Sequence, residues 1–171
     1  MNTIVTEKDK FNFIPPYGGN DFLNIKIDGE WIDKLLDSIY PNNDIIGTIP
    51  ILSFRLETDE EEEIVWKRFL PSENSSTIAP ILMCPDDCDF NCTLILAEVE
   101  NTKNKILWKR IGIDSSEIID NKEKVGSVVK WLNPEKQFEF DKLEYTKVIA
   151  EFKKQYDIDK KQYEEYCKSF K

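Results

Sequence analysis

Three cysteines at four-residue steps, Cys84, Cys88 and Cys92, offer the most recognisable chemistry in this sequence, and three aspartates stand between them. Thiolates gathered in one turn suit Zn²⁺, which takes four ligands in a tetrahedron, and an aspartate of the turn would supply the fourth. The spacing differs from C-x₂-C, so small apolar side chains packed in a tight turn explain the same pattern. We expect a packed turn and no cofactor, with a zinc-binding or thiol-sensing site at these cysteines as the alternative.

Acidic runs beside aromatic residues form the second set of candidates. Aromatic anchors rimmed by charge are typical of tight protein interfaces. The alternative is that the tryptophans lie in the core and the carboxylates lie on solvated faces. The residues predicted to bind a partner are Asp59, Glu60, Glu61, Glu62, Glu63 and Trp66 in one run, and Asp114, Glu117 and Asp120 in another.

The 171 residues include no histidine. Histidine is the usual general base and the commonest metal ligand, so its absence excludes Ser-His-Asp and Cys-His nucleophile arrangements and the usual zinc hydrolase sites. No Gly-rich phosphate loop or nucleophile elbow marks any pair of carboxylates. The sequence therefore predicts a binding protein and not an enzyme.

The charge of the chain favours a basic partner. Its 33 acidic and 23 basic residues give a formal net charge of −10. Such a field repels nucleic-acid phosphates and anionic lipid, and it speeds encounter with a basic protein. The alternative is that the acidity serves solubility alone. We expect a basic protein partner and neither nucleic acid nor membrane.

The sequence also predicts a cytoplasmic location. The first ten residues have no basic start followed by an apolar run, so they do not resemble a signal peptide. No stretch is long and apolar enough to cross a bilayer. In a reducing compartment the four cysteines are expected as free thiols or metal ligands.

The elements that position these residues follow from hydrophobic periodicity. Residues 1–20 contain Pro-Pro and Gly-Gly and are predicted to be an irregular arm, with residues 21–171 as a single domain. A helix is predicted over 32–39. C-terminal helices are predicted after Asp141, a capping residue, and again after Asp157. Antiparallel strands with helices on one face give an α+β fold. The predicted strands are 23–27, 49–56, 78–83, 93–100, 105–111 and 125–132.

The segment 80–108 resembles a group of small bacterial proteins of uncharacterised function. In that group a turn of the form C…C-G-x₂-G-C precedes two strands, and the second strand carries Val-x-Trp; Ile106-Leu107-Trp108 is similar here. The segments 24–31 and 138–145 resemble the group's Asp-Gly strand end and its Phe-x-Phe-Asp helix entry. Asp89 and Asn91 stand where the group tends to have glycine.

This resemblance implies no catalytic residues, because the group has none established. The small size and acidity of the chain are similar to those of immunity and antitoxin proteins of bacterial toxin systems. That likeness implies an inhibitor that caps a toxin, such as a basic nuclease, by steric and electrostatic occlusion.

Overall fold

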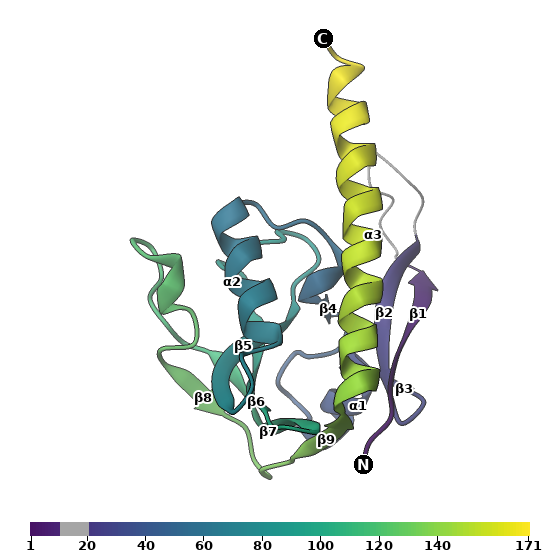
Figure 1. Cartoon of the computed structure of the whole chain (residues 1–171). Helices are drawn as coiled ribbons and strands as arrows, with labels where there is room; N and C mark the ends of the chain where they lie inside the picture. The colour runs from purple at the N-terminus through teal and green to yellow at the C-terminus, as the bar shows by residue number, and fades with distance from the viewer. Residues whose placement is uncertain (11–20) are drawn as a thin grey trace.

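A computed structural model describes residues 1–10 and 21–171, and in them two antiparallel sheets and three α-helices (Figure 1). The predicted α+β class is confirmed. The smaller sheet has the order β1 (Ile4–Lys10), β2 (Asp21–Ile27) and β3 (Glu30–Trp31). The larger sheet has the order β4 (Ile49–Pro50), β5 (Ser75–Met83), β6 (Leu94–Asn101), β7 (Lys105–Asp114) and β8 (Val129–Trp131), and β9 (Phe138–Asp141) also pairs with β7.

The predicted strands 93–100 and 105–111 correspond to β6 and β7, which pair as an antiparallel hairpin at the centre of the larger sheet. The edge of β7 that faces away from β6 pairs with two strands. The first residues of β7 pair with β9, and its last residues pair with β8. Gly112 permits the close approach of β8. A Cβ at this position would lie 2.4 Å from Cγ1 of Val129, so a larger residue fits only if atoms of β8 shift.

The helices are α1 (Ile32–Ile39), α2 (Asp59–Phe69) and α3 (Lys142–Lys168), with short 3₁₀ turns η1 (Ile51–Ser53) and η2 (Lys122–Lys124). The side chain of Asp141 accepts hydrogen bonds from the first turn of α3, as predicted. The predicted break after Asp157 is wrong. The segment contains no glycine or proline, and the i,i+4 ion pair between Lys153 and Asp157 favours an uninterrupted helix. The C-terminal turns of α3 extend past the rest of the fold (Figure 1).

An aromatic cluster joins α2, α3 and the larger sheet. Trp108 is fully buried and makes edge contacts with Phe69, Phe138 and Phe140. Its Nε1 donates to the hydroxyl of Tyr145 at 3.1 Å, and that hydroxyl donates to the carbonyl of Phe69 at 2.8 Å. Trp108 is therefore a core residue, and its indole N–H is satisfied inside the core.

The predicted irregular arm over residues 1–20 is partly wrong, because Ile4–Lys10 forms β1; residues 11–20 lie outside the described part of the chain. Only Ile4 of β1 is fully buried, so the strand carries no clear apolar alternation. Pairing with β2 and side-chain contacts to α3 stabilise it: Thr6 bonds to Glu151, and Lys8 bonds to Gln155 at 2.9 Å.

The strand predicted over residues 49–56 is confined to Ile49–Pro50. Pro50 has no N–H to continue the ladder, and the chain turns into η1. Ser53 then donates from its hydroxyl to the carbonyl of Leu23 at 2.7 Å, which ties this segment to β2.

Candidate functional site

The cysteine-bearing turn is the loop that joins β5 to β6. Met83 and Leu94 are cross-strand partners, so the two ends of the turn are held side by side. Two further contacts fix the turn against α2 and the segment before it. The amide of Glu57 donates to the carbonyl of Cys88 at 3.0 Å, and the amide of Phe90 donates to the carboxylate of Glu61 at 3.2 Å. The turn is therefore anchored at its tip as well as at its ends.

Two of the three predicted thiols converge. The sulfurs of Cys84 and Cys92 and a carboxylate oxygen of Asp87 all lie within 4.8 Å of one another. Cys88 is separate: its Sγ contacts the carbonyl of Pro85 at 3.4 Å, and its side chain packs on the hydrophobic core. Of the three predicted thiols, the structure therefore brings those of Cys84 and Cys92 together and leaves that of Cys88 outside the cluster. The positive φ of 50° at Cys88 turns the chain there and separates its thiol from the other two.

Two thiols of the turn, those of Cys88 and Cys92, are poor nucleophiles because their pKa values are raised. Burial, helped by the charges of Cys84 and the neighbouring aspartates, raises the pKa of Cys88 to about 11. Burial and a hydrogen bond with Cys84 raise the pKa of Cys92 to about 11. Reactive cysteines have a lowered pKa in electropositive surroundings, and this turn is electronegative.

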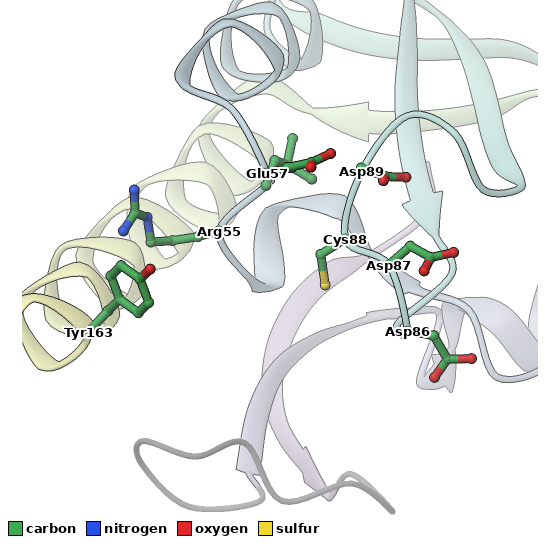
Figure 2. Close-up of a pocket in the computed structure, with 8 residues that line it drawn as sticks. Arg55, Glu57, Asp86, Asp87, Cys88, Asp89 and Tyr163 are labelled. Atoms are coloured by element: carbon green, nitrogen blue, oxygen red, sulfur yellow. The ribbon is translucent and has the colours of Figure 1, made fainter. Parts of the chain in front are cut away.

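An open groove of about 490 Å³ lies between the cysteine-bearing turn and α3. Figure 2 shows Arg55 and Tyr163 on one side, the turn on the other, and Glu57 between them. Among the described residues that line it, four side chains are carboxylates and one is a guanidinium. The lining residues are Arg55, Leu56, Glu57, Asp86, Asp87, Cys88, Asp89 and Tyr163.

The guanidinium of Arg55 lies against a carboxylate and an aromatic ring of the fold. Its Nε lies 3.6 Å from the carboxylate of Glu62, and its guanidinium carbon lies 4.9 Å from the centre of the Tyr163 ring. Within the described part of the chain, the carboxylates of Glu57, Asp86 and Asp89 and of their neighbour Asp87 make no ion pair. The groove therefore carries uncompensated negative charge.

The acidic run Asp59–Glu63 forms the start of α2, and the helix places some of its side chains in solvent and others in the protein interior. Thr58 and Glu61 form a capping box at the start of α2, and carboxylates in the first turn suit the positive end of the helix dipole. Asp59, Glu60 and Glu63 are exposed. Glu61 and Glu62 are buried, so the prediction that both belong to a partner-binding surface is wrong.

The two buried carboxylates hold other segments in place. Glu61 pairs with Lys122 at 3.1 Å, and it accepts hydrogen bonds from the amides of Thr58 and Phe90. Glu62 accepts hydrogen bonds from the amide of Leu56 and the hydroxyl of Tyr156. Buried charges are stable only when paired and hydrogen-bonded, which these contacts achieve.

The remaining predicted partner-binding residues fall into two groups. Trp66 is half-buried and packs edge-on against Tyr156, with ring centres 5.8 Å apart. Asp114 accepts hydrogen bonds from Ser116 and Gly126 and so organises the loop that follows β7. Glu117 and Asp120 are exposed on that loop. The structure therefore leaves Glu117 and Asp120, with three residues of α2, as exposed candidates.

Sequence patterns did not indicate Arg55, Glu57 or Tyr163 as groove residues. No local motif marks these positions, because they come from the segment before α2 and from a distant helix. Only their arrangement opposite the cysteine-bearing turn makes them part of one groove.

The contact between Tyr156 and Glu62 predicts a pH dependence. Burial, followed by the hydrogen bond to Glu62 and its charge, raises the pKa of Tyr156 to about 12. The folded state thus holds this proton more tightly than the unfolded state, where the pKa is about 10. We expect the contribution of Tyr156 to the free energy of unfolding to be complete below pH 10 and to be lost as the pH rises through about 12.

Urea denaturation from pH 8 to pH 12 of the wild type and of Tyr156→Phe tests this expectation. The difference in the free energy of unfolding between the two proteins should be constant up to about pH 10 and should then become smaller. A difference that stays constant, or one that grows, would contradict it.

Three comparisons with known proteins give no relative for this chain. No protein-family model matches it, and neither the curated proteins nor the solved structures contain a significant match. The likeness to a group of small bacterial proteins therefore stays a prediction. Among the described residues, no helix combines the length and apolarity required to span a bilayer.

Proposed function

We propose that this protein is a non-enzymatic binding protein whose acidic groove receives a basic segment of a protein partner. One observation carries the proposal: Glu57, Asp86, Asp87 and Asp89 surround an open groove and make no ion pair with the described residues. Arg55, the cation among the described residues that line the groove, already pairs with Glu62.

The lining of the groove favours a cationic protein segment. Small-molecule pockets are mostly apolar, whereas most of the side chains here are charged or polar. Lysine and arginine side chains make charge-assisted hydrogen bonds with carboxylates, and arginine does so through two parallel donors. The net charge of −10 would add long-range attraction and raise the rate of encounter with a basic partner.

The finer form of the proposal is an immunity-type inhibitor in the cytoplasm that caps a basic bacterial toxin. The acidity of the chain, the absence of histidine and the likeness of the segment 80–108 to small bacterial proteins support it. Inhibition would follow from occlusion, with carboxylates of the groove paired with lysines and arginines of the toxin.

Amide substitutions in the groove test the proposal. The groove variant carries Glu57→Gln, Asp86→Asn and Asp89→Asn, which remove three charges and keep the side-chain shapes. Asparagine at position 89 still offers an oxygen to the amide of Asn91, the partner of Asp89 in the turn. The matched control carries Asp59→Asn, Glu60→Gln and Glu63→Gln, three exposed charges of α2.

Immobilised wild type, groove variant and control would each be incubated with lysate of the native host, and retained chains would be quantified by mass spectrometry. We expect one basic chain in stoichiometric amount on the wild type and on the control, and about tenfold less on the groove variant, since three charge-assisted contacts are lost. Association rates should fall steeply with salt for the wild type and less for the groove variant.

Two results would contradict the proposal. Equal retention by the wild type and the groove variant would show that the groove does not bind the partner. A loss confined to the control would move the binding surface to the exposed residues of α2.

A further inference from the structure

The cysteine-bearing turn brings a soft and a hard type of ligand atom together. Two sulfurs, from Cys84 and Cys92, and one carboxylate oxygen, from Asp87, lie within 4.8 Å of one another. We propose that Cys84, Asp87 and Cys92 bind one thiophilic divalent cation, of which Zn²⁺ fits the donor set best. This inference shares Asp86 and Asp87 with the acidic groove, but metal binding is measured without a protein partner, so the two proposals can fail separately.

The backbone explains why these three side chains meet. Cys84 directly follows β5 and Cys92 lies two residues before β6, so the pairing of Met83 with Leu94 holds the two cysteines at the closed end of a hairpin. The tip of the turn is tied down through the carbonyl of Cys88 and the amide of Phe90. The ligand atoms are therefore positioned by the fold before any metal arrives, which lowers the entropic cost of binding.

The distances agree with a metal centre that closes by small side-chain rotations. With a Zn–S bond of about 2.3 Å, two thiolates of a tetrahedral zinc lie about 3.8 Å apart. The two sulfurs lie within 4.8 Å, so they need to approach each other by about 1 Å or less. Cys84 and Cys92 are partly exposed and Asp87 is exposed, so a cation can reach them from solvent.

The same turn contains a candidate for the fourth ligand. The carboxylate oxygen Oδ2 of Asp86 is 4.0 Å from the sulfur of Cys84. Asp86 or a water molecule would complete the tetrahedron. Two thiolates favour Zn²⁺ over Mg²⁺ and Ca²⁺, which prefer shells made wholly of oxygen ligands.

The third cysteine of the turn provides an internal control. Cys88 has the same sequence spacing as its neighbours, yet its sulfur contacts the carbonyl of Pro85 and its side chain packs on the core. A mere preference of zinc for cysteine-rich chains would involve all three thiols. The structure instead assigns the metal to Cys84 and Cys92 and leaves Cys88 out.

Metal titration of the full chain, kept reduced with a non-thiol reductant, tests the inference. We expect one Co²⁺ per chain, with the near-ultraviolet charge-transfer band of a cobalt–thiolate bond, and displacement of Co²⁺ by Zn²⁺. Cys84→Ser and Cys92→Ser should each weaken Zn²⁺ binding about a hundredfold or more, because each removes a thiolate ligand. Asp87→Asn should weaken it about tenfold, because an amide oxygen is a poorer zinc ligand, and Cys88→Ser should leave it unchanged.

Several results would overturn the inference. They are the absence of Co²⁺ or Zn²⁺ binding, a cobalt spectrum without the thiolate band, and a loss of affinity in Cys88→Ser equal to that in Cys84→Ser. A disulfide between Cys84 and Cys92 in protein purified in air, together with no Zn²⁺ binding after reduction, would identify a redox pair instead. The cobalt spectrum of the wild type requires no variant, so the inference stays testable if a serine variant misfolds.

Discussion

Glu61→Ala is expected to lower the free energy of unfolding by about 3 kcal/mol, the lower end of the range for breaking a buried ion pair. The side chain of Glu61 is fully buried, and its carboxylate pairs with Lys122 at 3.1 Å. Alanine would leave that ammonium without a partner and would remove the acceptor of the amides of Thr58 and Phe90. Lys122 is 22% exposed and keeps some hydration, which places the cost at the lower end.

Urea denaturation of three variants measures this effect. Glu60→Ala is the matched control, because Glu60 is the exposed neighbour in the same helical turn and its removal should cost about 0.5 kcal/mol or less. Glu61→Gln keeps one acceptor oxygen and removes the charge, so its cost should fall between the other two. Equal costs for Glu61→Ala and Glu60→Ala would show that the buried contacts do not contribute to stability.

Trp108→Ala is expected to cost about 3–5 kcal/mol, as large-to-small changes of buried aromatic residues do. The indole is fully buried among four aromatic rings, whose centres lie 5.2 to 6.3 Å from its own. Alanine would leave a cavity between β7, β9 and α3, and the stacked rings would collapse into it only in part. It would also remove the hydrogen-bond donor to the hydroxyl of Tyr145.

Two companion variants separate packing from hydrogen bonding. Trp108→Phe keeps an aromatic ring but loses the N–H, so it should cost less than alanine. Tyr145→Phe keeps the ring and removes the hydroxyl, which leaves the indole N–H and the carbonyl of Phe69 without their partner, at a cost of about 1–3 kcal/mol. A cost below about 1 kcal/mol for Trp108→Ala would contradict the central role of this cluster.

The acidic run at the start of α2 shows which features of a helix a sequence pattern predicts and which it does not. Asp59 to Glu63 is a like-charge run that fits either a solvated loop or the start of a helix, and in the structure it begins α2. The pattern does not show that Glu61 and Glu62 face inward, because their partners Lys122, Arg55 and Tyr156 come from other segments. Burial of a carboxylate depends on those distant partners, and helical periodicity contains no information about them.

The sequence by itself determined the elements whose signals are local. The helix over residues 32–39, the capping residue Asp141 and the hairpin of β6 and β7 follow from periodicity, capping chemistry and short turns, and together they establish the α+β class. The strand β1 and the short β4 needed the tertiary structure, because their limits depend on pairing with β2 and with β5. The single long α3 differs from its prediction for a local reason, because no glycine or proline interrupts the helix after Asp157.

Only the tertiary structure decided which residues form the candidate sites. Equal spacing of Cys84, Cys88 and Cys92 makes the three thiols equivalent in sequence, and the turn between β5 and β6 then selects two of them with Asp87. The acidic groove likewise joins the segment before α2, the turn and α3. Side chains far apart in the chain come into contact because their segments pack on one hydrophobic core. No local sequence pattern predicts those contacts.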